Sequence, residues 1–229
     1  TDQAYQIQTM AVKKRLAALA PIGFKAGLTS KSSQEKFGVT TAVAGVLLPS
    51  GLLAAEEGRF VVHSHIYNKL MMEAEVGFRL NVAIKAPIDD IASLRLMVAA
   101  ILPVVELPDL SFDKPDALKG VDIIANNVVA KHYVTGVEIP LGELDINDFN
   151  IEVQKDGDLL LEGVSSDAMG DQWQALLWLI NQTVANGWEI KPGQLLITGA
   201  IGRMVPAKVG FYQVNFGALG QVDFNVEEE

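Results

Sequence analysis

Three acidic residues stand at positions where their carboxylates can act together on one metal ion. Glu73 and Glu75 alternate with apolar residues, so in a strand their side chains share one face. Glu106 lies in the apolar segment Leu102-Pro-Val-Val-Glu-Leu-Pro, where a carboxylate is expected to be buried and to need a partner. Oxygen ligands without cysteine favour Mg²⁺ or Mn²⁺ over zinc. The alternative is that Glu73 and Glu75 form a solvated strand edge.

A lysine between two glycines is the second candidate for chemistry. Lys25 lies in Gly23-Phe-Lys-Ala-Gly-Leu-Thr-Ser, where small neighbours allow a ligand to come close. It can pair with a substrate carboxylate or donate a proton. No basic residue is near Glu106 along the chain, so we expect a metal ion as the partner of that carboxylate. The alternative for Lys25 is an ordinary surface lysine in a glycine-rich loop.

Other signals are weaker. His63 and His65 alternate on a strand-like stretch, as a metal pair or as exposed histidines at a strand edge. Asn127, with Lys131 and His132 nearby, belongs to a polar cluster that can line a pocket, although Asn127 can equally cap a turn. The glycine-rich Gly199-Ala-Ile-Gly is not followed by a lysine–serine pair, so a phosphate loop is not expected.

Composition excludes several classes of protein. The 229 residues are 49% hydrophobic with a formal net charge of −10, and Lys13-Lys14-Arg15 is the one basic cluster, so we expect no nucleic-acid partner. No apolar run approaches the roughly 18–20 residues of a membrane span. The absence of cysteine excludes disulfides and thiolate chemistry. An acidic surface repels small anions, so an acid substrate needs a local positive centre.

Periodicity and turn signals predict the elements that position these residues. The predicted helices are 1–19, 87–100 and 168–186, and the predicted strands are the end of 64–80, 101–107, 134–139, 149–155, 159–164, 194–198, 210–216 and 221–226. Residues 23–53 are expected to form loops and short strands around a site, and Asp156-Gly157 predicts a hairpin turn. We therefore expect one α+β domain over 1–229, with a folded or barrel-like, largely antiparallel or mixed sheet and peripheral helices. Its parts would be an N-terminal helix with site loops (1–60) and a β-rich core (61–229).

The ordered motifs resemble a known family along nearly the whole chain. The chain is similar to the 2-keto-4-pentenoate hydratase/4-oxalocrotonate decarboxylase branch of the fumarylacetoacetate hydrolase superfamily. The matching segments are Ala4-Tyr5-x-x-Gln8, Gly23–Ser30, Glu73-Ala74-Glu75, Val105–Asp109, Ile124–Asn127, Ile197-Thr198-Gly199 and Phe216–Val222. The interval between Glu75 and Glu106 (106 − 75 = 31) also matches.

This resemblance implies a fold, a site and a reaction class. It implies the folded sheet of the superfamily's C-terminal domain, a Mg²⁺ or Mn²⁺ ion held by Glu73, Glu75 and Glu106, and a small 2-oxo or 2-hydroxydienoic acid bound to that ion. Lys25 would be catalytic, and the expected substrate-binding residues are Leu28, Thr29, Asn127, Lys131 and Thr198. The implied enzyme is a lyase, a hydratase or decarboxylase of aromatic catabolism that works through an enolate. We also expect a cytoplasmic homo-oligomer.

Two departures from the family pattern leave the reaction open. Val43-Ala-Gly-Val-Leu lacks the acidic segment of the hydratases, and Val129-Ala130 replaces a pair of serines. Metal capture therefore looks intact while proton handling looks altered. Hydration, decarboxylation and tautomerisation stay open, as do an acylpyruvate-type C–C hydrolase and a non-catalytic protein that binds a small acid.

Overall fold

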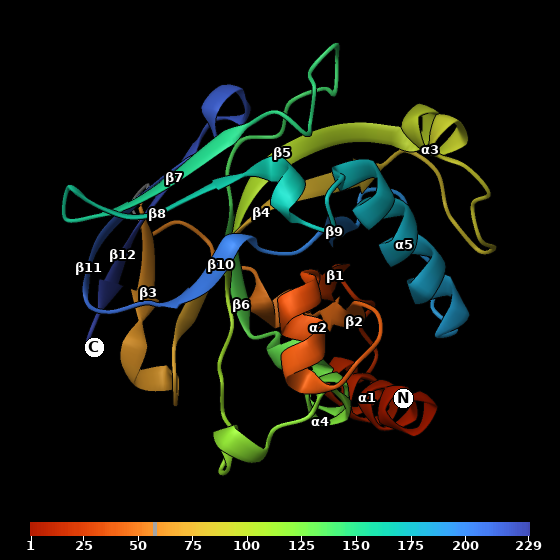
Figure 1. The fold of residues 1–229 in the computed structure, drawn as a ribbon, viewed down its shortest axis with the longest axis horizontal. Coiled ribbons are helices and arrows are strands. Elements are labelled where there is room, and N and C mark those ends of the chain that lie inside the picture. Colours follow the sequence, from red (N-terminus) through yellow and green to blue (C-terminus); the bar gives the residue numbers. More distant parts are fainter. Residues whose placement is uncertain (57–58) are drawn as a thin grey trace.

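Two curved sheets, with helices packed beside the larger one, make up the protein (Figure 1). The computed structural model describes residues 1–56 and 59–229. The larger sheet has seven strands in the order β2-β1-β9-β4-β5-β6, with β10 also pairing with β4. These strands are β1 (Gly23–Gly27), β2 (Val43–Leu47), β4 (Met71–Leu80), β5 (Val98–Leu107), β6 (His132–Thr135), β9 (Leu195–Ile197) and β10 (Ile201–Pro206).

The second sheet has five strands in the order β3-β12-β11-β7-β8. They are β3 (Phe60–His63), β7 (Asn150–Lys155), β8 (Asp158–Val164), β11 (Gly210–Asn215) and β12 (Gln221–Glu227). Among the described strands, pairings are antiparallel except for β1 with β9 and β3 with β12. The α+β prediction with a folded, largely antiparallel sheet is confirmed. The predicted hairpin is also present, with positive φ at Asp156 (52°) and Gly157 (89°), as its tight turn requires.

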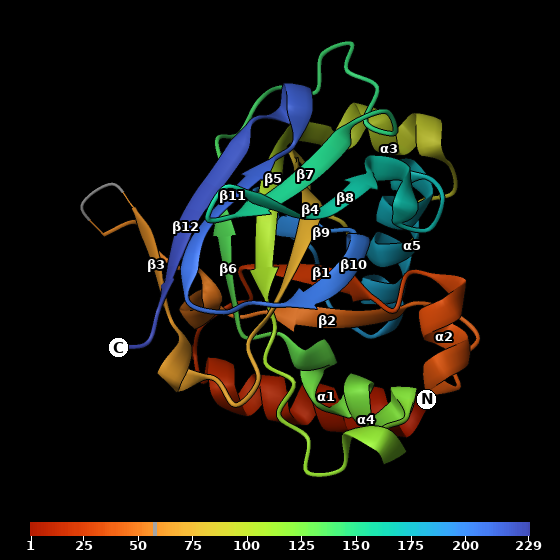
Figure 2. The same cartoon turned by 60° about the vertical axis from the view of Figure 1, so that its left-hand side comes forward.

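The helices pack beside the larger sheet, on one face and along the free edge of β2. Figure 2 shows α1 (Asp2–Leu16) and α4 (Gly120–Ala125) beneath β1 and β2, with α5 (Gln172–Ala185) at the side. The remaining α-helices are α2 (Lys31–Phe37) and α3 (Ile91–Met97), and the short 3₁₀ turns include η4 (Asn127–Val129). None of the helices in the described part of the chain is long and apolar enough to cross a membrane.

Strand β4 separates two differently built faces of the larger sheet. Its residues Met72, Ala74, Val76 and Phe78 join the main hydrophobic core under the helices, each with at most 1% of its surface exposed. The opposite face carries Glu73 and Glu75, followed by a second small apolar cluster. That cluster is Leu47, Leu102, Val104, Tyr133, Leu195 and Ile197. The inner face thus holds charged groups at one end and apolar packing at the other.

Several predicted elements differ from the structure. The helix predicted over 87–100 was too long, because Asp90 caps α3 by accepting the Ser93 N–H (2.7 Å) and β5 already begins at Val98. Pairing of Ala100 with Arg79 on β4 outweighs the helical pattern of these residues. Helix α2 was not predicted because none of its residues is buried, so it has no apolar stripe. The strand β10 was missed because its glycine-rich start was interpreted as a loop.

Packing of α5 provides a direct test of the core. Leu176 is fully buried, whereas the next residue on the helix, Leu177, is only partly buried. We predict that Leu176→Ala lowers the free energy of unfolding by about 2–5 kcal/mol, because it leaves a cavity between α5 and the sheet. The matched variant Leu177→Ala should cost about 1 kcal/mol or less. Urea unfolding measures both, and equal losses would contradict this packing.

Candidate metal and substrate site

The three predicted acids lie together on neighbouring strands. Glu73 on β4 pairs directly with Glu106 on β5, and Glu75 is two residues along β4 on the same face. One carboxylate oxygen from each lies within 4.8 Å of the others. Glu75 and Glu106 are fully buried, while Glu73 keeps some exposure. Glu73 and Glu75 therefore do not form a solvated strand edge. Of the three acids, Glu73 is the one that solvent can reach.

Lys25 projects from β1 into the same cluster. Its Nζ lies 2.5 Å from both carboxylate oxygens of Glu106 and 3.1 Å from the carbonyl oxygen of Val128, to which it donates. Only 1% of the surface of Lys25 is exposed, so the alternative of an ordinary surface lysine in a loop is excluded. Glu106 has no basic neighbour along the chain, but it has one in the folded structure. Strand β1 places Lys25, 81 residues earlier in the sequence, beside Glu106.

Glycines on β1 and β2 make room for the lysine side chain. Gly45 pairs with Lys25, and a Cβ at Gly45 would lie 3.0 Å from Lys25 Cγ and 3.0 Å from the Asn127 carbonyl oxygen. A Cβ at Gly27 would meet Val128 Cγ1 at 2.5 Å and Val43 Cγ2 at 3.7 Å. Val43 and Val128 therefore form an apolar wall beside Gly27, two residues along β1 from Lys25. This is the place where the family pattern has an acidic segment.

The turn that supplies the Val128 carbonyl is strained. Asn127, Val128 and Val129 all have φ between 52° and 54°, in the left-handed region that β-branched residues avoid. Each such residue costs about 1–3 kcal/mol and persists only where its surroundings enforce it. The Asn127 amide contributes by accepting the Val46 N–H and donating to the Val46 carbonyl, both at 2.8 Å. Asn127, predicted to bind substrate, is thus occupied in joining this turn to β2.

A second turn contacts Glu75 from the opposite side. The Gly199 N–H donates to Glu75 Oε2 (2.6 Å), while Glu75 Oε1 is buried without a hydrogen-bond partner. Gly199 has a φ of 108°, and a Cβ there would lie 2.4 Å from Thr29 Cγ2, so Thr29 lies against this turn. Leu28 precedes Thr29 with a φ of 52°. The unpaired Glu75 oxygen is therefore available as a metal ligand.

Thr198 lies next to this turn but faces elsewhere. Its hydroxyl is 2.6 Å from Gln172 Oε1 and 3.2 Å from the Val76 carbonyl. Gln172, at the start of α5, also donates to the Ser165 carbonyl. The contribution of Gln172 and of the Gly199 N–H was missed by sequence reasoning, because each depends on a contact between distant segments.

Burial and mutual repulsion change the protonation of the acids. Burial raises the pKa of Glu73 to about 8, opposed by Lys25 and supported by Glu106. Burial, followed by the charges of Glu106 and Glu73, raises the pKa of Glu75 well above its ordinary value. For Lys25, burial alone would lower the pKa, but Glu106, Glu73 and Glu75 outweigh it and raise the pKa. The lysine is therefore cationic, and without a metal ion Glu73 and Glu75 tend to retain protons.

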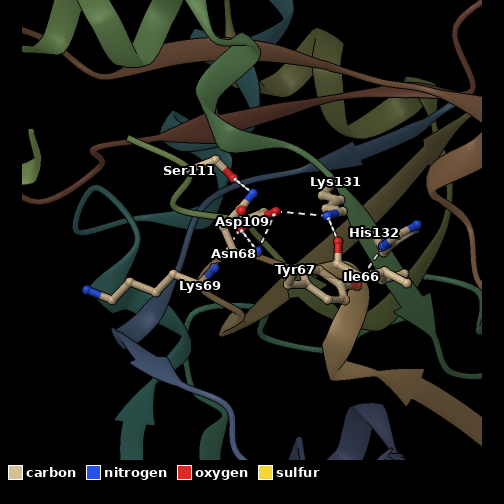
Figure 3. Close-up of polar contacts among 8 residues, drawn as sticks. All are labelled: Ile66, Tyr67, Asn68, Lys69, Asp109, Ser111, Lys131 and His132. Carbon is tan, nitrogen blue, oxygen red and sulfur yellow. Dashed lines mark hydrogen bonds and ion pairs between the residues drawn. The ribbon is translucent and has the colours of Figure 1, made fainter. Parts of the chain in front are cut away.

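Lys131 belongs to a separate polar network (Figure 3). Its Nζ donates to Asp109 Oδ2 (2.8 Å) and to the Ile66 carbonyl, and it lies 4.3 Å from the centre of the Tyr67 ring. The Tyr67 hydroxyl is 2.6 Å from His132 Nδ1. The predicted polar cluster around Lys131 and His132 thus exists, with the lysine ammonium occupied by protein groups.

Two other features lie apart from the acids. His63 and His65 are near the end of β3, on the five-stranded sheet, with ring centroids 5.9 Å apart. A cleft of about 800 Å³ lies between α1, residues 39–43 and the end of α5. Its lining includes Val43 but neither Lys25 nor any of the three acids. The groups capable of metal and proton chemistry therefore gather at the buried cluster and not in this cleft.

The raised pKa of Glu73 predicts how pH affects the metal-free protein. Because the pKa rises from 4.5 unfolded to about 8 folded, the folded state holds an extra proton between these values. Its stabilising contribution is complete below pH 4.5 and is lost as pH rises through about 8. We therefore expect Glu73→Gln to become progressively more stable than the parent chain from pH 5 to about pH 9. Urea unfolding with a chelator measures this. Glu143→Gln, at an exposed site, is the control, and a difference that does not grow with pH would contradict the prediction.

Known proteins are similar to this chain over most of its length. No protein-family model matches this sequence. A 2-keto-4-pentenoate hydratase from Dechloromonas aromatica (strain RCB) is 27% identical over 224 residues, which are 96% of this chain and 84% of the relative. A 4-oxalocrotonate decarboxylase from Pseudomonas sp. (strain CF600) is 24% identical over 211 residues, 90% of this chain and 78% of the relative. The names of both relatives are those of lyase-type enzymes, as predicted.

Solved structures share the fold. The 4-oxalocrotonate decarboxylase from Pseudomonas putida G7, in complex with magnesium and adipate, gives a TM-score of 0.90 at 22% identity, covering 99% of this chain and 86% of that one. A putative fumarylacetoacetate hydrolase family protein from Yersinia pestis CO92 gives 0.66 at 12% identity, covering 89% and 92%. The predicted resemblance is therefore confirmed: the chain is similar to 2-keto-4-pentenoate hydratases and 4-oxalocrotonate decarboxylase along nearly its whole length, and its fold is that of the fumarylacetoacetate hydrolase superfamily.

Proposed function

We propose that this protein is a lyase that uses one Mg²⁺ or Mn²⁺ ion to bind a small 2-oxo or 2-hydroxydienoic acid. The observation that carries the proposal is the convergence of Glu73, Glu75 and Glu106 within 4.8 Å, in a place with little access to solvent. Together with Lys25 they have a formal charge of −3 + 1 = −2, which one divalent ion balances. Without such an ion, repulsion and desolvation disfavour three ionised carboxylates.

The donor set fits a hard cation. All three side chains offer carboxylate oxygens, and Glu75 Oε1 has no other partner. Mg²⁺ prefers such ligands and usually keeps several exchangeable waters, which leaves positions for substrate oxygens. When bound, the ion would polarise the C2 oxygen of a 2-oxo acid and favour its enolate. The names of similar proteins agree with this, since the Pseudomonas putida decarboxylase was solved with magnesium.

Lys25 is the proposed proton donor and anion partner. Its ammonium group is cationic, buried and held between Glu106 and the Val128 carbonyl. A substrate carboxylate or enolate oxygen that replaces one of these contacts would keep the charge of the lysine satisfied. Proton donation from Lys25 to the enolate carbon or oxygen completes a reaction that needs a single proton.

The apolar wall formed by Val43 and Val128 favours decarboxylation or tautomerisation over hydration. Hydration requires a group that activates water as well as one that delivers a proton. Val43 and Val128, which lie beside Gly27 on the strand of Lys25, cannot ionise. The second candidate is a protein that binds small acids without turnover, and the same apolar wall is what favours it. An acylpyruvate hydrolase would also need a water-activating base, and neither valine can act as one.

The remaining expected residues divide by position. Thr29 and Leu28 adjoin the turn at Gly199 and are proposed to contact substrate. Asn127, Thr198 and Lys131 have their polar atoms in protein contacts and are proposed to act by shaping the site. Assembly into a homo-oligomer and residence in the cytoplasm are proposed by analogy with the family.

Calorimetric titration tests the metal site. We predict that Mg²⁺ or Mn²⁺ binds the parent chain, and that Glu73→Gln and Glu106→Gln each weaken binding at least about tenfold, because each removes one of three charged ligands. Glu106→Gln also leaves Lys25 without its partner, so the partly exposed Glu73 provides the safer variant. The control is Glu143→Gln, which should bind like the parent. No binding to the parent, or binding unaffected by Glu73→Gln, would refute the site.

Substrate incubations test the reaction. The parent chain is incubated with 2-hydroxypenta-2,4-dienoate, 4-oxalocrotonate, oxaloacetate and an acylpyruvate, each with and without Mg²⁺. We expect metal-dependent decarboxylation or ketonisation. Substrate absorbance and CO₂ release measure these two reactions. Tight oxalate binding with no turnover of any compound would favour the non-catalytic alternative.

Removal of the lysine separates metal binding from chemistry. We predict that Lys25→Met retains metal binding but lowers kcat by at least about tenfold to a hundredfold, as for a lost general acid. Lys155→Met, which removes a lysine at the exposed Asp156 hairpin, is the matched control. Full activity in Lys25→Met would exclude Lys25 from the mechanism.

A further inference from the structure

Asp109 is a nearly buried carboxylate that takes no part in the acid cluster. It is 8% exposed and follows β5, three residues after Glu106. Its Oδ1 accepts the N–H groups of Asn68 (3.0 Å) and Lys69 (2.9 Å), and its Oδ2 accepts from Lys131 Nζ (2.8 Å; Figure 3). Burial works to raise the pKa of Asp109, but these donors outweigh it and hold the pKa below its ordinary value. Asp109 is thus an ionised anchor with several donors.

Asp109 binds the segment that follows the strained turn at two points. Its backbone N–H donates to the Val129 carbonyl (3.3 Å), and its side chain binds the Lys131 ammonium. Lys131 is fixed in turn by the Ile66 carbonyl and by the Tyr67 ring. One residue therefore holds the main chain just before Ala130 and the side chain just after it.

The strained turn is held at both ends, and the lysine contact lies between them. At one end the Asn127 amide is bound to Val46 on β2. At the other end Val129 and Lys131 are bound to Asp109. The carbonyl of Val128, between these attachments, accepts from Lys25 Nζ at 3.1 Å. Since left-handed valines relax unless they are restrained, the direction of this carbonyl depends on both attachments.

We propose that Asp109 and Lys131 are positioning residues, which hold the Asn127–Val129 turn so that the Val128 carbonyl orients the ammonium group of Lys25. Lys25 reaches Glu106 through one part of its ammonium group and the turn through another. Loss of the Asp109–Lys131 pair removes one attachment at the far end of the turn, which is then held there by the Asp109 backbone N–H alone, so the Val128 carbonyl orients Lys25 less firmly. The inference rests on the proposed function only in that it assigns Lys25 to the site.

The alternative is an ordinary structural network. In that case loss of the pair lowers the stability of the protein but does not change the surroundings of Lys25. The two cases differ in the signal of the Lys25 ammonium group, which is observable by ¹H–¹⁵N correlation when a buried lysine exchanges its protons slowly. The signal is assigned as the one missing from Lys25→Arg. No metal or substrate is needed, so failure of the proposed function would leave this measurement unaffected.

The experiment compares two variants with matched controls. Lys131→Gln and Asp109→Asn remove the ion pair, whereas Lys155→Gln and Asp156→Asn remove the exposed pair at the β7–β8 hairpin. We expect the Lys25 ammonium signal to shift in both site variants and its protons to exchange at least about threefold faster, as for a locally loosened group. The controls should leave the signal unchanged, and Lys131→Arg, which keeps the pair, should restore the parent signal.

Three results would overturn the proposal. The first is an unchanged Lys25 signal in a folded Lys131→Gln or Asp109→Asn chain, even with a lowered Tm. The second is the same shift in the control variants. The third is the absence of a protected lysine ammonium signal in the parent chain. If one site variant does not fold, the other decides.

Discussion

Three carboxylates packed around one ammonium group set the constraint on which the rest of the structure depends. In such a place every oxygen needs a donor or a cation, because solvent does not reach Glu75 or Glu106. The fold supplies one lysine from β1 and one backbone N–H from the Gly199 turn. These donors leave Glu75 Oε1 unpaired. The surrounding glycines and left-handed residues follow from the need to bring backbone close to these side chains.

The two faces of the larger sheet differ in role: one contributes mainly to stability, and the other carries the acid cluster. The outer face carries the side chains that pack under α5, so stability is concentrated there. The inner face combines the acid cluster with the small apolar group that includes Val104 and Ile197. Because a charged interior weakens a core, the outer packing has to offset the cost of the inner face. Strand β4 is largely buried on both faces although only one of its faces is apolar.

The local sequence pattern and the family resemblance predicted that the three acids lie together. The contacts between distant segments could not be predicted from the sequence. The spacing of Glu73 and Glu75 fixes a shared face, and the apolar surroundings of Glu106 predict burial. The pairing of Lys25 with Glu106 joins residues 81 apart, and no periodicity reports it. Gly199 was interpreted only as part of a loop, because the sequence does not show that its N–H donates to Glu75. Helix α2 was missed because none of its residues is fully buried, so its sequence shows no apolar stripe.

The position of β1 has a consequence for the order of assembly. This strand lies between β2, which follows it closely, and β9, which begins at Leu195. A nascent chain therefore carries β1 with an unpaired edge until Leu195, 172 residues after Gly23 (195 − 23 = 172), has been synthesised. Such long-range closure gives the fold a high contact order, and exposed edges favour association with other chains. The segment bearing the lysine thus completes its strand pairing late, and the position of Lys25 in the acid cluster depends on a strand that is synthesised long after it.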